Sequence, residues 1–299
     1  MAVAVAIPSS AGAGLWRAIS SWRYVPLGGR DPRLDLLRGY LIFAMVADHM
    51  GGESWLYTVT GGGQFVVSAA EGFVFLSGLV MGMVYQKVIR RDGLRAALHK
   101  ALGRGLKLYA LHAVLTLGFA AASSLARAPW YTPVLDRVGY VVGVLTLRDT
   151  YYLTDVLHLY AVLVLAAPIA LLLLARGGTP MVLLASGLLW ATYQHSPGEL
   201  SFVTGSSAFP AAAWQVFFFT GLAVGYHRPR VWAFLGRIPR TPAILLSSCG
   251  AAALIAQQLS ADTLFQLDGW AGQSYEQIFY KWDVHPGRLI ASAVFLPLA

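Results

Sequence analysis

The fold is decided by the stretch Leu34-Asp-Leu-Leu-Arg-Gly-Tyr-Leu-Ile-Phe-Ala-Met-Val-Ala-Asp-His-Met50, an apolar segment in which ten residues separate Arg38 from His49. In an α-helix of about 100° per residue, eleven steps return to within about 20° of the starting direction, so both side chains share one face about 16 Å apart. Ionisable groups are costly inside a membrane helix, which makes them candidates for function. A plainer interpretation stays open, in which Arg38 reaches the lipid headgroups and His49 is a packed, hydrogen-bonded residue.

The composition of the whole chain is that of an integral membrane protein. Hydrophobic residues make up 57% of the 299 residues and charged residues only 12%. The mean hydropathy is +0.60, whereas soluble domains carry about 25% charged residues. We therefore expect an all-α, polytopic bundle of transmembrane helices, formed by one membrane domain over 31–299. A flexible, cytoplasmic lead-in is expected at 1–30, and a cleaved signal peptide is disfavoured because no positive charge opens the chain.

Apolar segments of spanning length recur along the sequence, and about eight membrane spans are expected. They lie at 34–52, 66–87, 106–127, 152–174, 180–195, 212–227 and 242–259, with one more that begins near Gly287. The connections on one side of these spans hold 16 of the 22 basic residues. Because Lys and Arg collect in cytoplasmic loops, we expect a cytoplasmic N-terminus. Arg38 then lies near the cytoplasmic end of the first span and His49 toward the far side.

Two carboxylates could act together with His49. Glu71 lies near the external end of the second span, at a depth comparable with His49, and could orient the imidazole as the third member of a relay does. The alternative is a bond from Glu71 to the backbone or to Ser68. Asp48 precedes His49, but adjacent helical side chains diverge by about 100°. Asp48 is therefore the weaker partner and could serve the substrate instead.

Other polar and small residues inside the spans favour structural roles. His112, Asp155 and His158 are expected to form paired internal contacts, and the i, i+3 spacing of Asp155 and His158 allows them to pair with each other. Gly78-Leu-Val-Met-Gly82 and Gly221-Leu-Ala-Val-Gly225 place small residues four apart, a pattern that permits close contact between membrane helices. We interpret both glycine pairs as packing.

The stretch from Lys87 to Lys107 carries seven cations between the second and third spans. It could simply set the topology and bind anionic lipid. Alternatively it forms a phosphate-binding shelf, with Arg104 and Lys107 at i, i+3 beside the membrane surface. The net charge of +8 needs no nucleic acid to explain it, because the positive-inside rule accounts for it.

Motifs for several kinds of chemistry are missing from the sequence. It has no HExxH metal motif, no Walker loop, no dinucleotide fingerprint and no GxSxG. Its single cysteine, Cys249, excludes an intramolecular disulfide and a cysteine-based metal site. We therefore expect no metal, and acid–base chemistry on a bound, activated donor is favoured.

The residues also carry a family resemblance. Arg33-Leu-Asp-Leu-Leu-Arg-Gly39 followed by Asp48-His49 resembles the opening helix of the type 3 membrane acyltransferase superfamily, whose hallmark is an arginine, ten residues and a histidine. Further motifs are similar, in this order, to the OpgC family, which is associated with succinyl transfer onto osmoregulated periplasmic glucans. They are Ala70-Glu-Gly-Phe-Val-Phe-Leu-Ser-Gly78, Asp155-Val-Leu-His-Leu-Tyr160, Phe209-Pro-Ala-Ala-Ala-Trp-Gln-Val-Phe-Phe-Phe-Thr-Gly221 and Trp282-Asp-Val-His-Pro-Gly-Arg-Leu289.

The resemblance implies an enzyme of the bacterial inner membrane that moves an acyl group from cytoplasmic acyl-CoA, as succinyl-CoA or acetyl-CoA, to a hydroxyl of an extracytoplasmic glycan. Carried onto this chain, His49 is the general base, Arg38 binds or polarises the donor, and Glu71 supports the site. Arg104 and Lys107 loosely match a basic pair at the cytoplasmic face, where lysine keeps a phosphate partner but loses bidentate geometry. The family bundle has about ten helices, so we expect the chain to be incomplete at its C-terminus.

Two other classes of function remain open at this point. A multi-pass transporter or proton-coupled permease could line a pathway with the same ionisable groups, but it predicts inverted repeats, and the sequence holds no convincing internal repeat. A membrane scaffold without chemistry leaves the charges inside the spans unexplained. Acyl transfer is the function that the resemblance implies.

Overall fold

The protein is helical throughout the part that the computed structural model describes, which is residues 32–49, 54–60, 67–126, 136–151, 154–197, 200, 209–264 and 278–295. No strand occurs in these ranges. The helices are α2 (Pro32–His49), α3 (Tyr57–Thr60), α4 (Ala69–Asp92), α5 (Leu94–Ala126), α6 (Arg137–Leu145), α7 (Asp155–Ala175), α8 (Thr179–His195), α9 (Ala211–Tyr226), α10 (Arg228–Leu235), α11 (Arg240–Leu264) and α13 (Pro286–Phe295). The expected lead-in at 1–30 lies outside the described residues.

The chain divides into two compact units, Met1–Tyr40 and Leu41–Ala299. The boundary falls within α2, so the described part of the smaller unit is the first half of that helix. The second half of α2 and every later helix belong to the larger unit, which contains the helix bundle.

Each expected span corresponds to a helix in the described part of the chain. Three of these helices, α4, α5 and α7, are long and apolar enough to cross a membrane. Two apolar segments are shorter, Ala211–Tyr226 in α9 and Thr241–Ala256 in α11. The all-helical membrane architecture is therefore confirmed, while eight crossings stay a prediction.

The basic stretch between the second and third spans joins α4 to α5. It is helical except at Gly93, whose φ of 85° lies in the left-handed region that favours glycine. Leu, Ala, Lys and Arg are strong helix formers, so α4 continues to Asp92 and α5 begins at Leu94. With 33 residues, α5 is about 50 Å long, well beyond an apolar layer of about 30 Å. The start of α5 can therefore extend out of the membrane.

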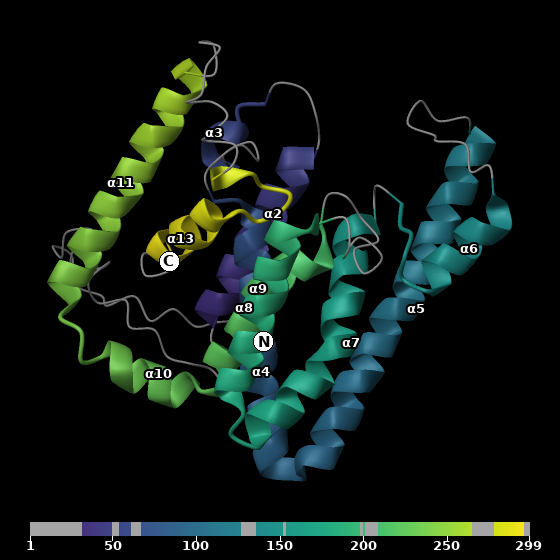
Figure 1. Cartoon of the computed structure of the whole chain (residues 1–299), viewed down its shortest axis with the longest axis horizontal. Coiled ribbons are helices and arrows are strands. Elements are labelled where there is room, and N and C mark those ends of the chain that lie inside the picture. The colour runs from purple at the N-terminus through teal and green to yellow at the C-terminus, as the bar shows by residue number, and fades with distance from the viewer. Residues whose placement is uncertain are drawn as a thin grey trace, which may run out of the picture. The chain divides into compact units, whose positions relative to one another are not determined.

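Helices α4 and α9 pack against each other along the centre of the bundle, with α5 and α7 beside them (Figure 1). Glycines of both helices make this contact. A Cβ added to Gly78 would lie 2.0 Å from the backbone oxygen of Phe218, and one added to Gly221 would lie 2.2 Å from the backbone oxygen of Phe75. Gly82 and Gly225 are equally close to the facing helix. The predicted packing role of both glycine pairs is confirmed.

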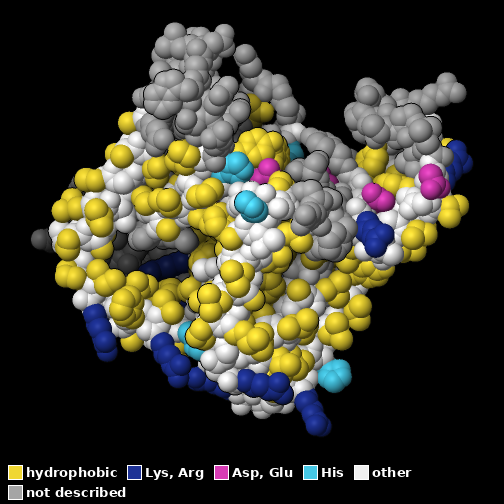
Figure 2. All heavy atoms as spheres, in the orientation of Figure 1, with side chains coloured by type: hydrophobic (Ala, Val, Ile, Leu, Met, Phe, Trp, Pro, Cys, Tyr) yellow, Lys and Arg dark blue, Asp and Glu magenta, His cyan; other side chains and the backbone are white. Residues whose placement is uncertain are grey.

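Lys and Arg side chains gather at one end of the bundle. Figure 2 shows them along the lower edge, near α10 and the turn between α4 and α5, with a wide apolar band above them. The visible Asp and Glu side chains lie toward the upper edge, where a few further Lys and Arg side chains also lie. Glu71 in the first turn of α4 and Arg91 in its last turn are separated by about 30 Å along the helix. This distance equals the thickness of a bilayer's apolar layer, about 30 Å.

Candidate active site

Glu71 is almost fully buried, with 1% of its surface exposed, in the first turn of α4. Its Oε2 accepts a hydrogen bond of 2.7 Å from the backbone N–H of Ser68, and its Oε1 accepts from Nε of Arg288 in a buried ion pair. The alternative prediction, that Glu71 bonds to the backbone or to Ser68, is thus confirmed. Arg288 is a second partner that this prediction did not include. Both carboxylate oxygens are engaged, so a role of Glu71 in orienting His49 stays a prediction.

Arg288 is the site residue that the sequence interpretation missed. The sequence interpretation assigned it no role. Arg288 lies in α13 and is only 4% exposed. A buried carboxylate needs a partner of opposite charge. The position of Arg288, at the start of the last apolar run, was the signal in the sequence that could have identified it.

The chain segment just before α13 is held by side chains from α8 and α9. The bonds run from Trp190 Nε1 to the Val284 carbonyl (2.9 Å), from Tyr193 Oη to Asp283 Oδ1 (2.7 Å), from Gln194 Nε2 to the Asp283 carbonyl (2.6 Å) and from Trp214 Nε1 to the Trp282 carbonyl (2.9 Å). Val284 is fully buried with a φ of 52°, which is rare for a β-branched residue. These contacts enforce that conformation, and they fix the entry of the chain into α13.

Lys281 brings a second cation to the same place. Burial and the charge of Arg288 lower the pKa of the Lys281 ammonium, while the carboxylates of Glu71 and Asp48 raise it. Two residues predicted from the sequence, Glu71 and Asp48, therefore act on the same ammonium. We call Asp48, Glu71, Lys281 and Arg288 the charged cluster.

His49 directly follows Asp48, a member of the charged cluster, at the end of α2. Asp48 Oδ1 accepts a 2.6 Å hydrogen bond from Thr60 Oγ1, which ties the end of α2 to α3. The exposed His49 ring has its Nδ1 2.6 Å from the Met45 carbonyl oxygen. A carbonyl can only accept, so Nδ1 carries the proton and a neutral ring has its lone pair on Nε2. His49 is thus in the tautomer that suits a general base at Nε2.

The other predicted site residues are spread over two helices. Arg38 is half-buried on α2, and its Nε is buried without a hydrogen-bond partner among the described residues. Arg104 and Lys107 are exposed on α5, in the half of the helix nearer to Leu94. Since α5 begins next to the last turn of α4, this pair lies toward the basic end of the bundle, away from Glu71.

A buried histidine pair connects α5 and α7. The Thr154 hydroxyl donates to the Tyr151 carbonyl (2.9 Å) and can therefore accept from Thr116 (2.8 Å). Thr116 in turn accepts from His112 Nδ1 (3.2 Å), which leaves His112 Nε2 to accept from His158 Nδ1 (3.3 Å). For two neutral rings, this chain of bonds leaves the lone pair of His158 on Nε2, a buried atom with no partner in the described ranges. The expected internal contacts of both histidines are confirmed.

The residues that the structure describes contain no group of three or more His, Cys, Asp or Glu side chains arranged to hold a metal ion. The absence of a resident metal stays a prediction of the sequence.

Comparison with known proteins identifies the family. The family model described as OpgC protein matches residues 30–299. No curated protein and no solved structure matches the chain. The matched range contains every described helix, His49 and all four residues of the charged cluster. The chain belongs to the OpgC family.

Proposed function

We propose that this protein is an integral membrane O-acyltransferase of the bacterial inner membrane. It transfers a succinyl or acetyl group from cytoplasmic acyl-CoA to a hydroxyl of an extracytoplasmic glycan. The observation that carries the proposal is the tautomer of His49, whose Nδ1 is held by the Met45 carbonyl while Nε2 remains available for a proton. Membership of the OpgC family supports the same class of reaction.

In the proposed reaction, His49 Nε2 takes the proton of the glycan hydroxyl while the hydroxyl oxygen attacks the thioester carbonyl. The tetrahedral intermediate then expels the thiolate of CoA, which receives the proton from the imidazolium. The carbon–oxygen bond of the new ester forms, the carbon–sulfur bond breaks, and the base is restored. An imidazole can both take up and release a proton, as these two transfers require.

The other residues have supporting roles in this proposal. The Nε of Arg38 is buried without a partner among the described residues, and we infer that it donates to acyl-CoA. The eleven-residue spacing of Arg38 and His49 in the sequence predicts that the donor extends over about 16 Å to bring its thioester to the base. The buried ion pair of Glu71 and Arg288 joins the start of α4 to α13. In this proposal Asp48 binds the glycan on the acceptor side.

Replacing His49 with alanine is expected to lower acyl transfer by about 100-fold or more, because the general base is lost. Membranes that contain the variant are given radiolabelled acyl-CoA, and label in the glycan fraction is measured per unit of protein. His99→Ala is the matched control, since His99 is also exposed and has its Nδ1 3.0 Å from the carbonyl four residues earlier. Activity retained in His49→Ala at normal protein level contradicts the proposal.

Arg38→Ala is expected to raise the acyl-CoA concentration needed for half-maximal transfer by about tenfold or more, the effect of losing one hydrogen bond to a charged group. Arg38→Lys keeps the charge but not the planar fork and should fall between the two. Initial rates over a series of acyl-CoA concentrations measure this. An unchanged response of the alanine variant to acyl-CoA argues against donor binding by Arg38.

A further inference from the structure

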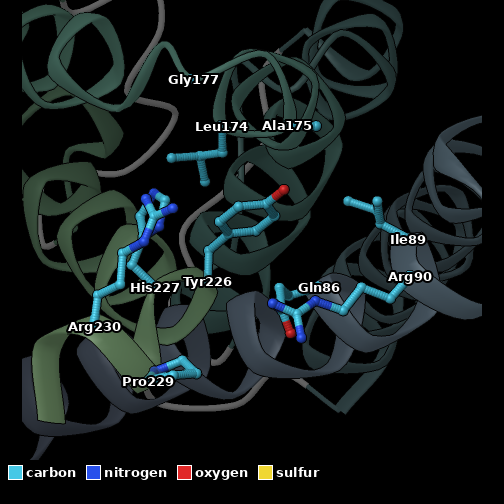
Figure 3. Close-up of a pocket in the computed structure, with 10 residues that line it drawn as sticks. All are labelled: Gln86, Ile89, Arg90, Leu174, Ala175, Gly177, Tyr226, His227, Pro229 and Arg230. Carbon is cyan, nitrogen blue, oxygen red and sulfur yellow. The ribbon is translucent and has the colours of Figure 1, made fainter. Parts of the chain in front are cut away.

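A pocket of about 440 Å³ lies at the basic end of the bundle, formed by the last turns of α4 and α7, the junction of α9 with α10, and the start of α10 (Figure 3). Its lining residues are Gln86, Ile89, Arg90, Leu174, Ala175, Gly177, Tyr226, His227, Pro229 and Arg230. This pocket is separate from the charged cluster, because Glu71 lies at the opposite end of α4. None of the residues in the proposed reaction lines it.

The lining carries an uncompensated positive charge. It contains two arginines, Arg90 and Arg230, and no Asp or Glu. With the Gln86 amide turned to accept, its oxygen lies 2.8 Å from both Nε and Nη2 of Arg90. A neutral amide orients the guanidinium without cancelling its charge. Both arginines are exposed at the protein surface, so they can be reached by a ligand.

A histidine and a tyrosine complete the pocket. His227 Nε2 lies 2.7 Å from Thr179 Oγ1, which fixes the ring. Burial and the charge of Arg230 lower the pKa of the His227 imidazole. The Tyr226 hydroxyl extends into the same space, between the side of Arg90 and the side of His227 and Arg230 (Figure 3). The pocket thus offers two guanidinium groups and a hydroxyl to one ligand.

We propose that this pocket binds a phosphate group, carried either by an anionic phospholipid headgroup or by a free phosphate-bearing compound such as a nucleotide. Guanidinium groups match phosphate oxygens in charge and geometry. The volume lies within the range of small-ligand sites, about 300–1,000 Å³, and exceeds that of a bare phosphate. The inference goes beyond the proposed acyl transfer and does not depend on it.

Helix α10 supplies an independent reason to include the lipid. It has no buried residue, its Trp232 is 51% exposed and its Phe234 is 62% exposed. Arg228 lies over the Trp232 ring at 5.3 Å. A short helix with exposed aromatic and basic side chains is suited to the membrane–water interface. Such a helix brings lipid headgroups to the level of Arg230.

The test compares two double variants of the full chain. Arg90→Gln/Arg230→Gln removes both charges of the pocket. Arg91→Gln/Arg237→Gln removes two exposed charges that lie close in sequence to the same two positions but do not line the pocket. In the lipid arm, retention of phosphatidylglycerol over phosphatidylcholine is measured by native mass spectrometry. In the free-phosphate arm, ADP binding to detergent-solubilised protein is measured by calorimetry.

In at least one arm, the pocket variant is expected to bind about tenfold or more weakly than the control variant. Loss in the lipid arm identifies a headgroup, and loss in the ADP arm identifies a free phosphate compound. If both variants bind each probe equally, or if the wild type binds neither probe, the proposal is overturned. Arg230→Gln alone, at an exposed position, repeats the comparison against Arg237→Gln if the double variant does not fold.

Discussion

Arg288→Met is expected to lower the free energy of unfolding by about 3–5 kcal/mol, because removal of one partner leaves the other buried charge uncompensated. Glu71 is 1% exposed and Arg288 is 4% exposed, so water cannot replace the missing guanidinium. Methionine keeps most of the apolar volume of the arginine, and the loss therefore reports the charge. The measurement is equilibrium unfolding of the purified protein in mild detergent.

Arg137→Met is the matched control, because Arg137 is exposed on α6 and its replacement should change stability by about 0.5 kcal/mol or less. The double variant Glu71→Gln/Arg288→Met should recover much of the lost stability, since it removes both charges while glutamine can still accept from the Ser68 N–H. A double variant no more stable than Arg288→Met would show that the ion pair is not the source of the effect.

The recovered double variant also separates stability from catalysis. If the ion pair only holds α13 against α4, the folded double variant keeps acyl transfer. If Glu71 also acts on His49, the double variant is folded but inactive. The same two measurements thus assign a role to the carboxylate that the sequence placed beside the imidazole.

The sequence predicted the long helices because apolar length and composition are local properties. The hydrophobic runs that contain α4, α5 and α7 are recognisable without any tertiary information. The short helices α6 and α10 were not expected, because each is shorter than a span and lies among charged or turn-forming residues. The i, i+3 spacing of Arg104 and Lys107 agrees with the helix that contains them, and Lys and Arg are residues that favour helix.

The site residues that lie close together in the sequence could be predicted, and those that are brought together only by the fold could not. Arg38, Asp48 and His49 share one helix, so their spacing alone placed them. Arg288 is 217 residues from Glu71 along the chain, and no sequence spacing connects them. Lys281 joins the cluster only because side chains from α8 and α9 hold the segment before α13. The requirement that a buried carboxylate be paired predicts that a partner exists, but the fold decides which cation it is.

Gly78→Ala is expected to destabilise the bundle by about 1–3 kcal/mol or more, because the added methyl group has no space between α4 and α9. Its Cβ would lie 2.0 Å from the Phe218 backbone oxygen and 3.0 Å from the Leu222 backbone nitrogen. Backbone atoms cannot turn aside as a side chain can, so the two helices must separate. Unfolding in mild detergent measures the loss.

Gly187→Ala on α8 is a control for which the expected change in stability has the opposite sign. A Cβ at Gly187 meets nothing within 4 Å, and alanine is the better helix former by about 1 kcal/mol. This variant should therefore be unchanged or more stable, whereas Gly78→Ala and Gly221→Ala should both be less stable. Because all three changes add the same methyl group to a helix, the difference in sign isolates the close approach of α4 and α9. Equal stability of Gly78→Ala and Gly187→Ala would mean that these helices do not pack through their glycines.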